Sequence, residues 1–242
     1  MPNNYFRFKE FTIQQEKCSM KVCTDACIFG AWIAEKVASI QLPVASCLDV
    51  GSGTGLLSLM FAQKNPNAII DAVEIEENAY DQAKENFSNS KWNDRLKIFH
   101  IDVKDFVSQK KYDFIISNPP FYENELHSNE KNKNIAKHDE GVLLKDMVAI
   151  TEKHLSPQGY FAVLLPYHRI KYFEELAEGN NFFLHQKLLI RQTPTHNFFR
   201  GILLFGNCKT DVKINELTIK NGESYTPAFT ELLKDYYLSL SL

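Results

Sequence analysis

Four consecutive residues, Asn118-Pro119-Pro120-Phe121, follow the apolar run 112–116 and its terminal serine, and they carry groups suited to chemistry. Neither proline has an N–H to donate, so a strand that reaches this point must end and the chain must turn outward. Because a residue before proline is held extended, the Asn118 amide projects from the strand end. Asn118 Oδ1 and the Pro119 carbonyl can accept the two hydrogens of a planar amino group, while the Phe121 ring stacks on its π-face. The motif therefore predicts reaction at an amino nitrogen that is conjugated to a ring or a carbonyl group.

A glycine-rich loop, Gly-Ser-Gly-Thr-Gly at residues 51–55, joins a buried strand predicted over 47–50 to a helix predicted over 56–64. Glycines let the backbone approach a ligand closely and adopt positive φ, and the start of the helix offers free N–H groups. The last glycine comes one residue earlier than in the Gly-x-Gly-x-x-Gly pattern of nicotinamide cofactors. The loop therefore indicates a bound ligand and disfavours a nicotinamide-dependent oxidoreductase.

Polar side chains stand at the ends of four predicted strands. Glu74 ends a strand over 69–74 and can accept both hydroxyls of a ribose, whereas Asp102 follows a strand over 96–101 and can accept the exocyclic amine of an adenine. Taken singly, each could also be a solvated charge. Ligands of open α/β sheets bind beyond the carboxyl ends of the strands, so one site would collect all four groups. The combination is similar to that of S-adenosylmethionine-dependent methyltransferases, and the candidate cofactor residues are Asp49, Gly51, Gly53, Gly55, Glu74, Asp102 and Asn118.

The composition is that of a globular protein, with 242 residues, 44% hydrophobic residues and a net charge of −3. The negative charge argues against wholesale coating of nucleic acid, although a local basic face remains compatible with it. No apolar run approaches the length of a membrane span, and the first residues lack an apolar core, so we expect a soluble cytoplasmic protein. The cysteines are odd in number and lack the spacing of a zinc site, so we expect reduced thiols and no metal. They are Cys18, Cys23, Cys27, Cys47 and Cys208.

The order of the predicted elements indicates an α/β fold of the Rossmann-like class I methyltransferase type. Two strands, over 182–191 and 201–207, are separated by a connection too short for a crossover helix, so they should pair antiparallel. We therefore expect a seven-stranded, mostly parallel sheet with an antiparallel strand at its edge. The other five predicted strands cover 47–50, 69–74, 96–101, 112–117 and 160–165, and predicted helices separate them except between 96–101 and 112–117.

Smaller additions flank this core at both ends of the chain. Alternating apolar residues over 5–15 predict a β-hairpin, which a helix over 26–39 follows, and the chain ends with a strand over 212–219 and a helix over 228–238. We expect one class I methyltransferase domain over 1–242. Its parts are the N-terminal hairpin and helix (1–44), the catalytic core (45–208) and the C-terminal strand and helix (209–242).

Basic residues interleaved with aromatic ones lie between positions 185 and 213. Single-stranded nucleic acid is recognised by basic groups that follow phosphates and by rings that stack on unpaired bases. Because alternate residues of a strand face opposite sides, the same residues are also compatible with scattered surface charges and core aromatics. The candidate RNA-binding residues are Lys187, Arg191, His196 and Arg200. Residues 123–140 lack apolar periodicity, and we interpret them either as a mobile lid over the site or as a solvated insertion.

Motifs spread over nearly the whole chain resemble those of the bacterial tRNA1(Val) (adenine(37)-N6)-methyltransferases. The resemblance implies S-adenosylmethionine-dependent methylation of the N6 amine of the adenine next to the anticodon. It implies that Asn118, Pro119 and Phe121 hold an adenine that has left the base stack. The motifs are Phe6 to Gln15, Met20-Lys21-Val22-x-Thr24-Asp25, Leu48-Asp49-x-Gly51-x-Gly53-x-Gly55-Leu56-Leu57, Asp71-Ala72-Val73-Glu74, Ile115 to Phe121, and Tyr225-x-x-x-Phe229 through Tyr236-Tyr237-Leu238.

The resemblance also assigns partners and a second group of cofactor residues. Lys21, Thr24 and Asp25 would close the site over the amino acid part of S-adenosylmethionine. The implied partner is tRNA, bound through its anticodon loop, and we expect a monomer that needs neither a membrane nor a metal ion.

Other activities are compatible with part of this pattern. Methyltransferases of guanine N2 in ribosomal RNA also carry Asn-Pro-Pro-Phe, but they often have an extra domain for which this chain has no room. Enzymes that methylate a glutamine amide in a translation factor use the same motif, favour Tyr after the prolines and need no RNA affinity. A catalytically silent RNA-binding or partner-binding protein is disfavoured by the intact motif.

Overall fold

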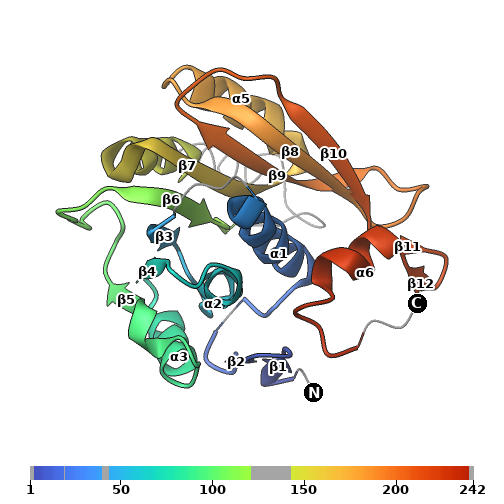
Figure 1. Ribbon diagram of the computed structural model, residues 1–242, viewed down its shortest axis with the longest axis horizontal. Coiled ribbons are helices and arrows are strands. Elements are labelled where there is room, and N and C mark those ends of the chain that lie inside the picture. The colour runs from blue at the N-terminus through green and yellow to red at the C-terminus, as the bar shows by residue number, and fades with distance from the viewer. Residues whose placement is uncertain (1–2, 19, 40–43, 121–142, 240–242) are drawn as a thin grey trace, which may run out of the picture.

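The computed structural model describes residues 3–18, 20–39, 44–120 and 143–239, and its centre is one large sheet (Figure 1). The strands of this sheet are β3 (Ser46–Val50), β4 (Ile69–Glu74), β5 (Leu96–His100), β6 (Tyr112–Ser117), β7 (Leu155–Pro166), β8 (Phe183–Arg191), β9 (Phe198–Gly206) and β10 (Lys213–Thr218). Their order across the sheet is β10-β8-β9-β7-β6-β3-β4-β5. Neighbouring strands are parallel, except that β9 runs antiparallel to both β7 and β8.

Helices cover both faces of this sheet, because its central strands are apolar on both sides (Figure 1). One face packs against α1 (Thr24–Ser39), α2 (Leu56–Lys64), α3 (Glu77–Ser88) and α6 (Pro227–Leu233), and the other against the helix 143–154 and α5 (Ile170–Glu178). Helix α1 is buried along most of its length, and a Cβ at Gly30 would stand 2.5 Å from Met60 Sδ. The absence of a Cβ at Gly30 therefore allows α1 and α2 to pack closely.

The predicted α/β class is confirmed, with two corrections to the sheet. The sheet has eight strands, because the C-terminal strand β10 joins its edge beside β8. The antiparallel strand β9 lies inside the sheet between β7 and β8, and not at the edge. The short connection predicts that β8 and β9 pair, but it leaves open which of them lies beside β7.

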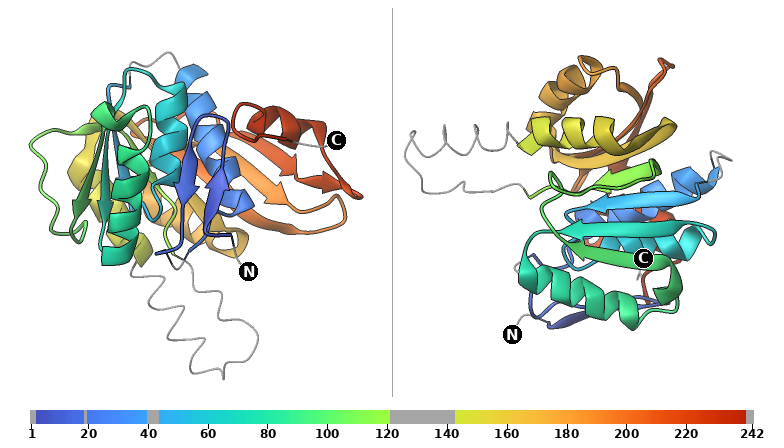
Figure 2. Two further views of the ribbon diagram at one scale, coloured as in Figure 1. Left: turned by 90° about the horizontal axis from the view of Figure 1, so that it is seen from below. Right: turned by 90° about the vertical axis from the view of Figure 1, so that its left-hand side faces the viewer.

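The N-terminal and C-terminal additions pack on each other. The predicted hairpin is present as β1 (Tyr5–Arg7) and β2 (Thr12–Gln14), and it lies against α3 (Figure 2). The Lys9 N–H donates to the Tyr236 carbonyl over 2.8 Å, and Phe8 forms a bridge with Tyr237. A small hairpin, β11 (Lys220–Asn221) and β12 (Ser224–Tyr225), precedes α6. Helix α6 ends at Leu233, earlier than predicted, because the following residues Tyr236 and Tyr237 contact the N-terminal hairpin.

Candidate active site

The carboxyl ends of four neighbouring strands meet at one edge of the sheet. Val50, the last residue of β3, lies opposite Val73 of β4 and Ser117 of β6. Glu74, the last residue of β4, lies opposite His100 of β5. Paired strands lie about 4.8 Å apart, so the residues that follow these ends stand side by side. The structure thus brings together the glycine loop, Glu74 and the segments that begin after Ser117 and His100.

The glycine loop has the backbone conformation that its glycines predict. Gly51, Gly53 and Gly55 have φ values of +70°, +54° and +79°, which side chains with a Cβ rarely adopt. A Cβ at Gly51 or Gly53 would meet no atom within 4 Å, so the space beside these two residues is open. At Gly55, in contrast, a Cβ would stand 2.5 Å from the Phe87 ring. The first two glycines therefore leave room for a ligand, whereas the third allows α3 to pack on the loop.

Glu74, at the end of the neighbouring strand β4, is hydrogen-bonded to the glycine loop. Its Oε2 accepts the Gly53 N–H at 2.8 Å, and its Oε1 accepts the N–H groups of Ile75 and Glu76 at 2.9 and 3.0 Å. The side chain is almost fully buried, with 8% of its surface exposed. These bonds fix the carboxylate beside Gly53, and Oε2, which accepts one N–H group, retains a lone pair for a hydroxyl donor.

Asp49 lies in β3, two residues before the glycine loop, and one of its carboxylate oxygens has no hydrogen-bond partner. Its Oδ2 accepts the Ser58 hydroxyl at 2.6 Å, whereas its buried Oδ1 has no hydrogen-bond partner. Burial raises the pKa of Asp49 to about 7, although the Ser58 hydrogen bond lowers it. A buried carboxylate that lacks one partner is suited to a cationic or N–H donor ligand, such as the ammonium group of an amino acid.

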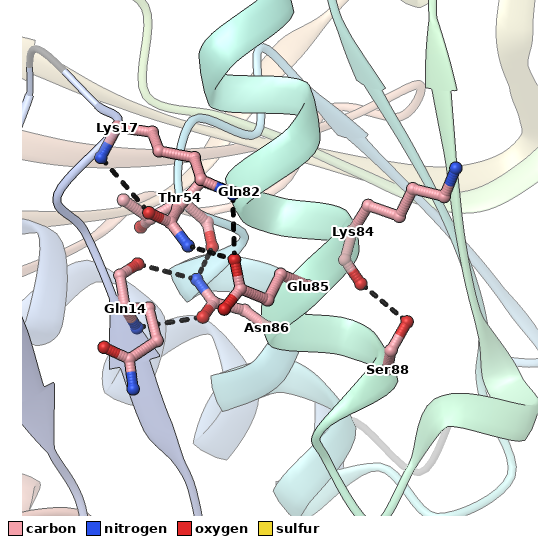
Figure 3. A network of polar contacts seen from close by, with 8 residues as sticks. All are labelled: Gln14, Lys17, Thr54, Gln82, Lys84, Glu85, Asn86 and Ser88. Atoms are coloured by element: carbon pink, nitrogen blue, oxygen red, sulfur yellow. Dashed lines mark hydrogen bonds and ion pairs between the residues drawn. The ribbon is translucent and has the colours of Figure 1, made fainter.

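Asn86 of α3 is a structural residue of the site that the sequence does not reveal. Its Nδ2 donates to the Thr54 carbonyl of the glycine loop and to the Gln14 carbonyl of β2, both at 2.9 Å, and its Oδ1 accepts the Gln14 N–H (Figure 3). Lys17 adds an ion pair of 3.1 Å with Glu85 one position earlier on α3. The buried Asn86 amide thereby ties the N-terminal hairpin to the loop. The amphipathic pattern of α3 indicates a buried face there, but the partners of Asn86 are 32 and 72 residues away in the chain.

The predicted residues that follow β5 and β6 are described in part. Asn118 is half-buried and Pro119 is buried at the end of β6, where the Ser117 hydroxyl donates to the Val50 carbonyl at 2.9 Å. Asp102 follows β5, and its Oδ1 accepts the Lys104 N–H at 2.9 Å. Phe121 and the segment 123–140 lie outside the described residues.

The residues that the resemblance places over the cofactor have partners of their own. Lys21 Nζ donates to the Gln15 carbonyl at 2.6 Å, and Thr24 is exposed at the start of α1. Asp25 forms an ion pair of 2.9 Å with Arg200 Nε, in which 15% and 20% of the two side chains are exposed. This pair joins a predicted cofactor residue to a predicted RNA-binding residue.

The four predicted RNA-binding residues do not form one surface. Lys187 pairs with Glu174 of α5 at 2.5 Å. Ile190 lies opposite Arg200, but Arg191 lies opposite Phe198, so a β-bulge falls at Phe199. Arg200 therefore faces α1, and Arg191 points to the face of the sheet that carries α5.

His196 is exposed in the connection between β8 and β9, and its Nδ1 forms a hydrogen bond of 2.6 Å with Thr193 Oγ1. This connection lies at the same end of the sheet as the glycine loop. The reason is that β9, which the connection precedes, starts beside the carboxyl end of β7, where Pro166 is paired with Arg200.

The residues at the glycine loop are compatible with S-adenosylmethionine, because Asp49 Oδ1 has no hydrogen-bond partner and a Cβ at Gly51 or Gly53 would meet no atom within 4 Å. The described residues contain no cluster of three or more His, Cys, Asp or Glu side chains that could hold a metal ion, and the five cysteines are free. Within the same residues, no helix combines the length and the apolar character that crossing a membrane requires.

Comparison with known proteins gives matches over nearly the whole chain. The family model of the methyltransferase small domain matches residues 40–183. A tRNA1(Val) (adenine(37)-N6)-methyltransferase of Dyadobacter fermentans is 41% identical, over 98% of this chain and 99% of the relative. The protein of that name from Christiangramia forsetii is 37% identical, over 99% of this chain and all of the relative. A solved structure, a predicted O-methyltransferase of Agrobacterium tumefaciens, has a TM-score of 0.65 at 14% identity, covers 86% of this chain and 95% of its own, and shows the shared fold alone.

Proposed function

The chain belongs to the family of tRNA1(Val) (adenine(37)-N6)-methyltransferases, and from this premise we propose that it methylates the N6 amine of adenine 37 in tRNA1(Val) with S-adenosylmethionine as its cofactor. The similarity to the named relatives over the full chain carries this proposal. The site supports it, because the open space at the glycine loop lies beside the end of β6, where Asn118 stands.

The cofactor side of the site rests on three groups. Backbone N–H groups of the glycine loop and the unsatisfied Asp49 oxygen would hold the methionine part, and Glu74 Oε2 would accept a ribose hydroxyl. Asp102 would accept the adenine amine. When bound, S-adenosylmethionine would supply a methyl group on a sulfonium.

The substrate side requires alignment more than acid or base catalysis. Asn118 Oδ1 and the Pro119 carbonyl would accept the two N6 hydrogens and hold the amine in a fixed orientation, and Phe121 would stack on the base. One of the two hydrogens would leave as a proton when the nitrogen gains the methyl group. The tRNA presents adenine 37 in its anticodon loop, where the base is unpaired and leaves the stack at low cost.

For the remaining predicted residues we propose separate roles. Arg191 and His196 would contact RNA at the carboxyl edge of the sheet. Lys187 would anchor β8 to Glu174 of α5, and Arg200 would position Asp25 at the start of α1 over the cofactor. Lys21 and Thr24 would close the same side.

We further propose a monomer that works in the cytoplasm and consists of one domain over 1–242. The contact of Lys9 and Phe8 with the C-terminal tyrosines supports this organisation, because it joins both ends of the chain to one body.

Nucleoside mass spectrometry of bulk tRNA incubated with the purified protein and isotopically labelled S-adenosylmethionine tests the chemistry. We expect the label in N6-methyladenosine. Label in N2-methylguanosine of ribosomal RNA, or in a protein glutamine amide, with none in tRNA, would overturn the proposed substrate and retain the cofactor.

A further inference from the structure

A partly exposed cluster of two rings and a guanidinium group stands at the carboxyl edge of the sheet. We call it the aromatic platform, and it consists of Tyr167, Phe198 and Arg191. The centroids of the Tyr167 and Phe198 rings are 5.7 Å apart, and the guanidinium carbon of Arg191 lies 5.1 Å from the Phe198 centroid. The side chain of Tyr167 is 46% exposed although it directly follows the buried end of β7.

The aromatic platform lies at the same end of the sheet as Asn118, where we propose that the target amine binds. Ser117 of β6 is paired with Val163 of the adjacent strand β7, so Asn118 and Tyr167 both follow the ends of neighbouring strands. Phe198 reaches this edge from β9, because the β-bulge at Phe199 turns its ring to the face that carries Arg191. A chain that places one base at Asn118 can therefore extend over β7 to the platform.

The guanidinium of Arg191 is held in place on this surface. Its Nε donates to Thr218 Oγ1 at 2.9 Å, and its Nη2 lies 3.1 Å from Glu216 Oε2. A fixed cation against a ring preserves a flat face and adds positive potential. A second pair of the same kind follows, in which the guanidinium carbon of Arg169, the residue before α5, lies 5.8 Å from the ring of Tyr172 on α5, and Tyr172 is 37% exposed.

Exposed rings with stacked arginines are the groups that recognise unpaired bases, since every base offers a π-face and every nucleotide a phosphate. Core aromatics would be buried, as Phe205 on the same strand is. We propose that the aromatic platform receives an unpaired base of the anticodon loop next to the target adenine, with Tyr167 as the exposed stacking ring. This inference rests on the proposed function and names a specific contact for its substrate.

Fluorescence anisotropy with two RNAs tests the platform. One is a hairpin that copies the anticodon arm of tRNA1(Val), and the other is a blunt duplex of the same length. The variants are Tyr167→Ala, Phe198→Ala and Tyr167→Phe, and the matched control is Tyr5→Ala, whose ring is 52% exposed on β1.

We expect Tyr167→Ala and Phe198→Ala each to weaken hairpin binding about tenfold, the loss that removal of one stacked base contact produces. Tyr167→Phe and Tyr5→Ala should bind the hairpin like the wild type, and all variants should bind the duplex equally. Wild-type hairpin affinity in both alanine variants, or an equal loss for duplex and hairpin, would overturn the platform.

Methyl transfer to tRNA by the wild-type protein is measured separately, so that the two proposals fail in different ways. Tyr167-dependent hairpin binding without methyl transfer would reject the proposed function and retain the platform. Normal transfer with an unchanged KM for tRNA in Tyr167→Ala would reject the platform and retain the function.

Discussion

The glycine loop and the connection between β8 and β9 face the same edge of the sheet, but they are assembled from different contacts. In the loop, positive φ values and the bonds from Glu74 to Gly53 follow from a short motif and the strand beside it. Around the connection, Arg191 and Arg200 take opposite faces because of one β-bulge. The comparison teaches that the backbone of the glycine loop follows from a short motif, whereas the directions of Arg191 and Arg200 depend on how distant strands pair.

We expect the largest effect at Asn118, where a substitution should reduce methyl transfer but not cofactor affinity. Asn118→Ala should reduce single-turnover methyl transfer about 100-fold or more, because the amine loses the acceptor that aligns it. Cofactor affinity, measured by calorimetry, should stay within about twofold, since the side chain would hold the substrate. Asn93→Ala, an exposed position beside β5, serves as the control and should leave both quantities unchanged. A parallel loss of transfer and cofactor affinity in Asn118→Ala would contradict the role given to it.

A smaller effect on cofactor affinity should distinguish Gly53 of the glycine loop from Gly222, which has a similar backbone conformation in the turn between β11 and β12. Gly53→Ala and Gly222→Ala both place a Cβ at positive φ, +54° and +64°, and neither Cβ meets an atom within 4 Å. Both variants should lose about 1–3 kcal/mol of unfolding free energy through backbone strain. Only Gly53→Ala should also lose cofactor affinity, by about tenfold, because its Cβ enters the space that the ligand needs. Equal cofactor affinity in the two variants, measured by calorimetry, would place the cofactor elsewhere.

The titration of Asp49 gives the cofactor side a pH dependence. Because burial raises its pKa in the folded protein to about 7, the folded state holds a proton that the unfolded state releases near its ordinary pKa. The unfolding free energy of the cofactor-free protein should therefore fall as the pH rises from about 4 to about 7. In Asp49→Asn this component should be absent, as denaturant titrations at several pH values can show. An identical pH dependence in both proteins would assign the titration to another group.

Cofactor affinity should change with pH in the opposite direction. A deprotonated Asp49 would attract the ammonium of the methionine part, so affinity should increase severalfold as the pH rises through about 7. Asp49→Asn should bind the cofactor with little change over the same range. Calorimetry at several pH values measures this, and a flat wild-type profile would exclude the contact.

The smallest effect is expected at Lys187, which the sequence groups with the RNA-binding residues. Lys187→Met should leave hairpin RNA affinity and its salt dependence unchanged, because 15% of the Lys187 side chain is exposed, against 29% of the Arg191 side chain. Arg191→Gln should weaken hairpin binding and reduce the salt slope. Equal losses in both variants, measured by anisotropy at several salt concentrations, would return Lys187 to the RNA surface.

The sequence predicts those features whose physical cause is local. The glycine loop, the strand-end position of Glu74 and the end of β6 at Asn118 follow from short motifs and the missing N–H groups of two prolines. The extra strand β10 was also visible in the pattern, but not its partner in the sheet. Phe121, a residue of the same motif, lies outside the described residues.

Other features could not be predicted because their partners are distant in the chain. Asn86 joins the glycine loop to the N-terminal hairpin across 32 and 72 residues, and an amide on a helix looks the same in sequence whether or not it does so. The β-bulge at Phe199 shifts every later side chain of β9 to the other face, so alternation along the strands does not by itself predict the faces of Arg191 and Arg200.

The proposed reaction is tested most directly by locating the methyl group in the RNA. A transcript of tRNA1(Val) is incubated with the protein and labelled S-adenosylmethionine, digested with a ribonuclease and analysed by mass spectrometry of the fragments. The account predicts one labelled methyl group on the fragment that contains adenine 37, and no label when that nucleotide is replaced by guanine. Label at any other nucleotide, or label that persists in the guanine transcript, would contradict it.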